Sequence, residues 1–243
     1  MLDETTYYFT AFAIDQNNDI IDSQTLSITT DFWWHVTPNT LLYIPMNTDL
    51  LDHGNNNISI SDNSWVVIQN WRWYFNWSSR LLINNFNTYL NSLPFTISIW
   101  VNSQNWNNVW IFTSSNVYSW WYRWWNFWKM GSNESNKIRL ECLPSWNIRT
   151  SSWITDNTRT LYWFSIQNWS AKIYKNWVVE ATLTSFNLQF VANLRIWNQR
   201  FASQYWEENF FKWFMAEYIV ENKARSDAER LDYYNKTKKK FWY

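Results

Sequence analysis

The fold of this chain is restricted first by short runs of alternating residues. From Leu41 onward, runs of roughly five to nine apolar or alternating residues recur about every ten residues, and clusters of Asn, Ser and Trp separate them. Residues 96–101 (Thr-Ile-Ser-Ile-Trp-Val) and 137–142 (Lys-Ile-Arg-Leu-Glu-Cys) show the alternation most clearly. Such spacing is typical of a sandwich or a barrel of β-strands. The sequence therefore predicts an all-β domain.

Helical periodicity is found once, near the end of the sequence. Ser226 and Glu229 have the spacing of a capping box, in which Glu229 can return a hydrogen bond to the Ser226 amide. Leu231 and Tyr234 then share one helix face. We predict a two-sheet antiparallel sandwich for residues 41 to about 222, followed by one short helix from about 227 to 236, where a lysine-rich end begins.

Residues 1–30 read as a strand, a polar turn and a second strand. Residues 6–13 resemble strand F of a fibronectin type III module, and the following segment would be its strand G. Two strands cannot bury a core of their own. We therefore predict that this stretch is the remnant of a preceding domain and adds little to the sandwich core, with residues 31–40 as a linker. No charged and apolar leader follows Met1, which places any secretory signal, and further domains, upstream of this sequence.

Charge and composition exclude several functional classes. The chain has 20 Lys and Arg residues against 20 Asp and Glu residues, a balance that favours neither nucleic acid nor an anionic membrane surface. A hydrophobic content of 47% argues against general disorder. The sequence contains no run of 18 apolar residues, and it therefore predicts no membrane insertion. The single cysteine, Cys142, cannot form an intrachain disulfide and is expected to be a small buried residue.

Tryptophan stands where turns ordinarily use glycine. The chain has 23 tryptophans and 2 glycines, whereas ordinary usage would give about 17 glycines. Many of the tryptophans directly follow asparagine or serine, at Trp71, Trp77, Trp106, Trp169, Trp177, Trp65, Trp120, Trp146 and Trp153. Residues 172–180 read as a hairpin around Asn176-Trp177, where a type I′ turn needs positive φ at both central residues. A tryptophan there would carry about 1–2 kcal/mol of strain.

These positions suggest a hypothesis about decoding. UGA is read as glycine in some bacterial lineages, and translation with a table that reads it as tryptophan would replace glycine in this way. Restoring about 18 of the tryptophans would return glycine to its ordinary frequency. Trp34, Trp100 and Trp163 stand in apolar strand contexts and are expected to be authentic, while Trp73 and Trp110 fit either origin. The alternative is a tryptophan-rich surface that binds a sugar or polymer, which leaves the missing glycines unexplained.

With glycine at those positions, residues 41–243 resemble the concanavalin A-like lectin/glucanase superfamily, in its laminin G-like jelly-roll branch. The resemblance rests on ordered blocks, of which residues 94–101 (Pro-Phe-Thr-Ile-Ser-Ile-Trp-Val) are the closest. The other blocks are residues 41–46 with 49–52, 73–81, 171–179, and 194–197 with 211–218. The resemblance implies a jelly-roll fold for the predicted sandwich.

Hydrolases of this fold place carboxylates at two-residue intervals on one strand, so that nucleophile and acid share a face. This sequence has no such set. Glu207 and Glu208 are adjacent, and Glu217 and Glu221 could share a face, but the resemblance implies a structural role for Glu217. His35 and His53 lie in different segments and lack zinc-site spacing. We expect no catalysis, no cofactor and no metal.

A calcium site has one weak candidate in the sequence. Asp49, Asp52 and Asn55 form an oxygen-rich turn, and calcium prefers such oxygens. An ordinary solvated turn explains these residues equally well.

The most unusual segment is residues 118–128, which hold five tryptophans. With glycine in their place it becomes a glycine-rich loop whose Tyr122, Arg123, Asn126 and Phe127 could stack on and hydrogen-bond a ligand. A plain surface connection is the alternative.

We predict a non-catalytic binding module of a cell-surface or secreted multidomain protein, with a carbohydrate or a protein as its ligand. The alternatives are a structural spacer resembling a tail fibre, and a glycan hydrolase of the same fold.

Overall fold

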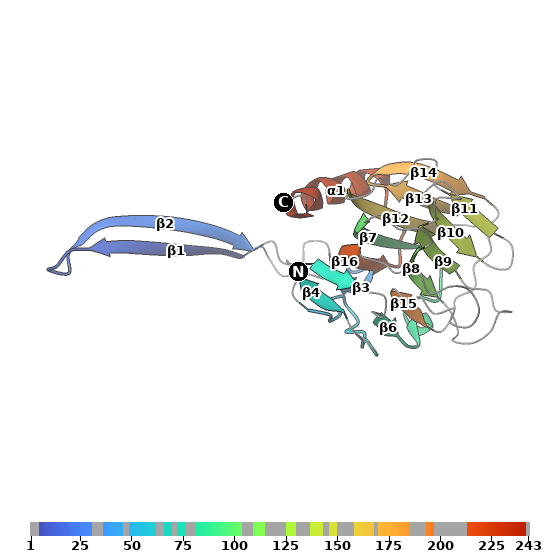
Figure 1. Ribbon diagram of the computed structural model, residues 1–243, viewed down its shortest axis with the longest axis horizontal. Helices are drawn as coiled ribbons and strands as arrows, with labels where there is room; N and C mark the ends of the chain where they lie inside the picture. Colours follow the sequence, from blue (N-terminus) through green and yellow to red (C-terminus); the bar gives the residue numbers. More distant parts are fainter. Residues whose placement is uncertain are drawn as a thin grey trace. The chain divides into compact units, whose positions relative to one another are not determined.

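The computed structural model describes sixteen strands, a 3₁₀ turn and a C-terminal helix in the residues given next (Figure 1). The described residues are 5–30, 36–45, 49–61, 66–69, 72–75, 81–103, 109–114, 125–129, 137–142, 146–149, 158–167, 170–184, 193–196 and 213–241. The chain divides into two compact units, Met1–Thr37 and Pro38–Tyr243.

The first unit is an antiparallel hairpin of β1 (Thr5–Ile14) and β2 (Ile20–Thr30), as the sequence predicts. Its turn is organised by Asp15, whose Oδ1 accepts hydrogen bonds from the amides of Asn17 at 2.8 Å and Asp19 at 3.0 Å. Several large side chains of the hairpin are exposed, among them Tyr8, Phe12 and Ile21. This agrees with the expectation that two strands bury no core of their own.

The second unit is a sandwich of two antiparallel sheets, which confirms the predicted all-β class. The first sheet has eight strands, in the order β14 (Val178–Leu183), β13 (Ser170–Lys175), β12 (Arg159–Gln167), β7 (Phe95–Ser103), β16 (Trp213–Glu221), β5 (Arg72–Phe75) and β4 (Val67–Gln69), with β3 (Thr40–Ile44) also paired to β16. The second has six, in the order β11 (Trp146–Arg149), β10 (Ile138–Cys142), β9 (Trp125–Lys129), β8 (Val109–Ser114), β15 (Leu194–Ile196) and β6 (Leu81–Ile83). A 3₁₀ turn, η1 (Phe86–Thr88), follows β6.

The core lies between the two sheets. On β7 the side chains of Phe95, Ile97 and Ile99 belong to it, and on β12 Phe164 and Ile166 join them. The second sheet contributes further residues, including Leu140 of β10, and together these form one apolar cluster. Because side chains alternate along a strand, the residues between them stand on the outer face of the eight-stranded sheet.

That outer face is covered by helix α1 (Asp227–Phe241), so β7 and β12 are buried on both sides. Trp100 of β7 stacks on Tyr234 with ring centroids 5.8 Å apart, and Trp163 of β12 meets the edge of Tyr233 at 4.9 Å. Both tryptophans are at most 1% exposed. Their burial agrees with the expectation that these two are native residues, whereas Trp34 lies outside the described residues.

The helix is longer than predicted, and its buried face is different. It continues through the lysines to Phe241, because lysine is a good helix former and cations are stabilising near a helix C-terminus. Leu231, which the sequence places on one helix face with Tyr234, is 40% exposed, whereas Tyr234 is buried. The face toward the sheet consists of Arg230, Tyr233, Tyr234 and Thr237. The Trp100 indole donates to the Thr237 hydroxyl at 3.2 Å.

The hairpin turn between β13 and β14 corrects a prediction about Trp177. Among the described residues the positive φ angles belong to asparagines, and in this turn Asn176 has φ 58° while Trp177 does not lie in that region. Lys175 pairs with Val178, so the turn has two residues. Asparagine tolerates the left-handed region better than other side chains do. The strain expected at Trp177 is therefore absent, because Asn176 takes the demanding conformation.

Gly54 is required by close packing rather than by positive φ. A Cβ at this position would lie 2.9 Å from Asp52 Oδ1 and 3.1 Å from the Tyr43 amide nitrogen. We expect Gly54→Ala to lower the free energy of unfolding by about 1–3 kcal/mol, because it disturbs the hydrogen bonds of a buried carboxylate. Urea unfolding measures this, with exposed Ser59→Ala as the control. An unchanged midpoint for Gly54→Ala would contradict the close contact.

Candidate functional site

The structure places only part of the loop proposed from the sequence. Tyr122 and Arg123 lie outside the described residues. Asn126 and Phe127 lie on strand β9 rather than in a loop, at positions that pair with Glu141 and Leu140 of β10. Adjacent strand positions belong to opposite faces of a sheet. The positions of Asn126 and Phe127 therefore belong to opposite faces of the sheet, and a site formed by all four residues stays a prediction.

A different polar site lies on the outer face of the eight-stranded sheet. It is an open pocket of about 430 Å³ between β12, β13 and the beginning of α1. Its lining consists of Ser165, Gln167, Ser170, Lys172, Tyr174, Ala224, Arg225, Ser226, Asp227 and Arg230. We refer to these residues as the α1 pocket. A volume of this size is in the range of small-molecule sites.

The strand side of the α1 pocket follows from the alternation of β12 and β13. Ser165 pairs with Lys172 and Gln167 pairs with Ser170, and all four line the pocket. The residues between them are apolar, and they are buried on the other face. Cross-strand partners stand on the same side of a sheet, so two strands present four polar side chains together.

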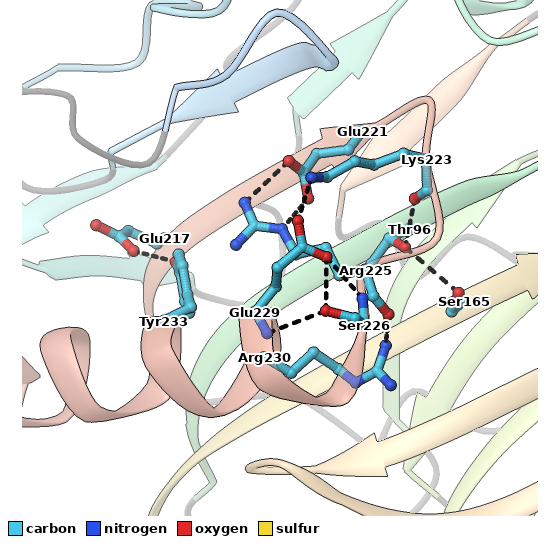
Figure 2. A network of polar contacts seen from close by, with 10 residues as sticks. All are labelled: Thr96, Ser165, Glu217, Glu221, Lys223, Arg225, Ser226, Glu229, Arg230 and Tyr233. Atoms are coloured by element: carbon cyan, nitrogen blue, oxygen red, sulfur yellow. Dashed lines mark hydrogen bonds and ion pairs between the residues drawn. The ribbon is translucent and has the colours of Figure 1, made fainter.

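The helix side of the α1 pocket is shaped by the predicted capping box (Figure 2). The Ser226 amide donates to Glu229 Oε2 at 2.7 Å, and the Glu229 amide donates to the Ser226 hydroxyl at 3.3 Å. Lys223 adds an ion pair to Glu229, with Nζ 2.6 Å from Oε1. The Thr96 hydroxyl holds the preceding turn to the sheet by donating to the Lys223 carbonyl at 2.7 Å. The helix therefore begins at a defined place above β12 and β13.

Arg225 is held in the wall of the pocket by a buried ion pair (Figure 2). Its guanidinium donates to both carboxylate oxygens of Glu221, with Nη2 2.9 Å from Oε1. The Arg225 side chain is 7% exposed and that of Glu221 is 1% exposed. The rings of Trp163 and Tyr233 lie 5.4 and 5.1 Å from the guanidinium carbon. Glu221 therefore neutralises Arg225 from behind the pocket.

Arg230 lies across the ring of Tyr174, with its guanidinium carbon 3.8 Å from the ring centroid. It donates to the Arg225 carbonyl and to Asp227. Its Nε is buried and has no hydrogen-bond partner in the described part of the chain. The Arg230 side chain is 4% exposed, whereas that of Asp227 is 84% exposed. Among the described residues, the charge of Arg230 is thus compensated by one carboxylate, at the rim of the pocket.

The remaining cation of the α1 pocket is Lys172. Its side chain is exposed, and it forms no ion pair with any described residue. Among the described residues, Glu221 and Asp227 each compensate one guanidinium, so Lys172 leaves one excess positive charge at the pocket. An anionic group entering the pocket would meet this charge first.

Glu217, the first member of the carboxylate pair considered in the sequence, is engaged in the structure. It accepts hydrogen bonds from the hydroxyls of Tyr43, at 3.2 Å, and Tyr233. Burial raises the pKa of both tyrosines well above its ordinary value, and the Glu217 charge raises it further. Both hydroxyls therefore keep their protons and donate. Glu217 joins β3, β16 and α1, which is the structural role that the resemblance implied.

The oxygen-rich turn at residues 49–55 is also engaged by the protein itself. Asp52 accepts from the amides of Tyr43 at 2.9 Å, Gly54 at 2.7 Å and Ile58 at 2.7 Å. Asp49 contacts the His53 ring, with its Oδ1 2.8 Å from Nε2. In the described residues no group of three or more His, Cys, Asp or Glu could hold a metal ion. The Cys142 side chain lies outside the described part of the structure.

The start of α1 is expected to depend on pH through Glu229. The ion pair with Lys223 and the Ser226 amide lower the pKa of this carboxyl from 4.5 to about 2. The unfolded chain therefore binds the proton first as the pH falls, and the stabilisation present above about pH 4.5 is lost toward pH 2. Because the Glu229 side chain is 44% exposed, we expect its interactions to contribute at most about 1 kcal/mol to the free energy of unfolding.

The test compares the wild type with Glu229→Gln by urea unfolding between pH 2 and 7. The stability difference should be present at pH 7 and should shrink toward zero near pH 2. A difference that stays constant over this range would contradict the assignment.

The α1 pocket was not predicted from the sequence, although part of its pattern is visible there. Ser165, Gln167, Ser170 and Lys172 alternate with apolar residues, which indicates a polar sheet face. That face would ordinarily be solvated. Only the position of α1, which depends on contacts far apart in sequence, turns it into a pocket.

Comparison with protein-family models gives no match, and comparison with curated proteins gives none. Solved structures do match, among them three of botulinum neurotoxins. The binding domain of botulinum neurotoxin serotype C1 has a TM-score of 0.64 at 15% identity, over 82% of this chain and 52% of that one. A structure of botulinum neurotoxin type C, whose cell entry is described as dependent on interaction with two ganglioside molecules, has a TM-score of 0.66 at 14% identity. The match covers 82% of this chain and 51% of that one. The binding domain of botulinum neurotoxin DC in complex with rat synaptotagmin II has a TM-score of 0.62 at 13% identity, over 82% of this chain and 51% of that one.

This chain therefore spans about half the length of the structures it matches. At these identities the likeness concerns the fold alone. It assigns the chain to the class of two-sheet antiparallel jelly-roll sandwiches with one C-terminal helix. In the described residues, no helix has the length and apolar character needed to cross a membrane.

Proposed function

We propose that this protein is a non-catalytic binding module that recognises carbohydrate. The α1 pocket is the observation that carries the proposal. Serine hydroxyls, the Gln167 amide and cationic side chains line it, and sugar hydroxyls form hydrogen bonds with such groups. The buried carboxylates nearest to it, Glu217 and Glu221, are engaged with tyrosines and with Arg225. A pocket with polar donors and engaged carboxylates suits binding rather than hydrolysis.

The finer parts of the assignment are also proposals. The sandwich is assigned to the laminin G-like branch of the concanavalin A-like superfamily, and residues 1–30 to the end of a fibronectin type III-like module. The neurotoxin binding domains that share the fold support a role at the cell surface or outside the cell. Tyr122, Arg123, Asn126 and Phe127 remain a proposed second contact region.

A glycan array with the full chain tests the function. We expect retention of a restricted group of glycans, and loss of that retention in Ala224→Phe, which places a ring in the α1 pocket. Ala228→Phe is the matched control, because it makes the same substitution at an exposed position of α1 outside the pocket lining. If no glycan is retained, carbohydrate recognition is contradicted and a structural spacer becomes the better account. If Ala224→Phe binds normally, the pocket is not the site.

We also propose that the recoding of UGA accounts for many of the tryptophans. Trp177 supports this, because it stands at an exposed hairpin turn in a place that glycine commonly occupies, and it is 41% exposed. Sequencing the gene decides the question. UGG codons at positions 71, 77, 169, 177 and 197 would exclude recoding.

A further inference from the structure

The charge of the α1 pocket indicates which kind of sugar it takes. Three cations line it, and one carboxylate, Asp227, stands at its rim. Glu221 is buried behind Arg225 and does not line the pocket. Lys172, on the strand side, has no ion pair with another described residue. A neutral sugar would leave this charge uncompensated, whereas a sugar that carries one carboxylate would balance it.

Arg230 gives a second, independent indication. Its side chain is almost fully buried in the lining, and its Nε has no hydrogen-bond partner among the described residues. An unsatisfied donor on a buried cation is costly, and a bound acceptor would offset that cost. The ion pair that Arg230 does form is with Asp227, whose exposed carboxylate can be displaced toward solvent. A carboxylate in the pocket can then take the position of Asp227 and use the guanidinium fork.

The beginning of α1 lies at the pocket, where Asp227 and Glu229 of its first turn already meet the partial positive charge of the helix N-terminus. Ser226 and Asp227, which open the helix, both line the pocket. On the opposite wall, Ser165, Ser170 and Gln167 offer groups for the hydroxyls of a sugar ring. The anionic and the polyhydroxyl parts of an acidic sugar are therefore both matched.

We infer that the α1 pocket binds an acidic monosaccharide unit, with the carboxylate of the sugar between Lys172 and Arg230 and its ring hydroxyls toward the polar face of β12 and β13. This inference rests on the proposed function and adds the class of sugar to it. A free anion shares the charge of such a unit but lacks its hydroxyls. The two sources are distinguished by the arms of the test.

The experiment titrates the full chain with D-glucuronate, with D-glucose and with sulfate, by isothermal calorimetry at low ionic strength. We expect glucuronate to bind at least tenfold more tightly than either glucose or sulfate. Lys172→Gln should weaken glucuronate binding at least tenfold. Lys175→Gln, on the same strand but outside the pocket lining, should leave it unchanged.

A second variant guards against a loss of folding. Gln167→Glu adds a negative charge to an exposed residue of the lining, and should weaken glucuronate binding while leaving the thermal unfolding midpoint unchanged. Equal binding of glucose and glucuronate overturns the acidic class but leaves the proposed function standing. If sulfate binds as tightly as glucuronate, the pocket is an anion site only, and the inference that it binds a sugar is overturned. If none of the three binds while the array retains glycans, the pocket assignment fails and the proposed function does not.

Discussion

Glu221→Ala is expected to lower the free energy of unfolding by about 3–5 kcal/mol, the largest effect of a single carboxylate in the described structure. The substitution leaves the guanidinium of Arg225 without its partner at a place where its side chain is only 7% exposed. An unpaired buried charge costs far more than the pair contributes. Urea unfolding at pH 7 measures the difference.

Asp232→Ala is the matched control for this prediction. Asp232 also pairs with a cation four residues along the chain, Lys236, but both side chains are more than half exposed. Exposed pairs contribute about 0–1 kcal/mol. Similar losses in the two variants would show that the Glu221–Arg225 pair is solvated, and would contradict the position of α1 on the sheet.

Trp163→Ala should be about as destabilising, at about 3–5 kcal/mol, because it empties the space between β12 and α1. The indole is fully buried, contacts the ring of Tyr233 and lies 5.4 Å from the guanidinium carbon of Arg225. Thermal or urea unfolding tests this, and intrinsic fluorescence reports separately whether the aromatic packing is retained.

Trp177→Gly is the contrasting substitution, for which we expect a change of about 1 kcal/mol or less. Trp177 is 41% exposed, and its ring lies 4.6 Å from that of Tyr234, so one aromatic contact is lost. No backbone strain is relieved, because the positive φ belongs to Asn176. A large gain in stability would show that the turn requires glycine. A large loss would show that the ring is an essential packing element, against the recoding proposal.

The local elements of the fold could be predicted from the sequence because their causes are local. Alternation identified β7 and β10, two alternating runs around a polar turn identified each of the two hairpins, and Ser226 with Glu229 identified the start of α1. These patterns depend on residues close together in the chain, where period and turn chemistry decide the structure.

Elements that depend on distant partners could not be predicted in this way. Arg230 would be expected on the exposed face of a helix, yet it is buried because Tyr174 and the Arg225 carbonyl receive its guanidinium. The strand β9 was read as part of a loop, because its closely spaced tryptophans obscure the alternation. The α1 pocket combines both difficulties, since neither of its walls is unusual until the helix lies over the sheet.

The central claim is that this protein binds a carbohydrate and does not cleave it. The most direct measurement incubates the full chain with a glycan that the array retains, and follows in the same sample both the bound fraction and the release of reducing ends. The account predicts saturable binding and complete recovery of the intact glycan. Release of reducing ends in amounts exceeding the protein present would contradict it.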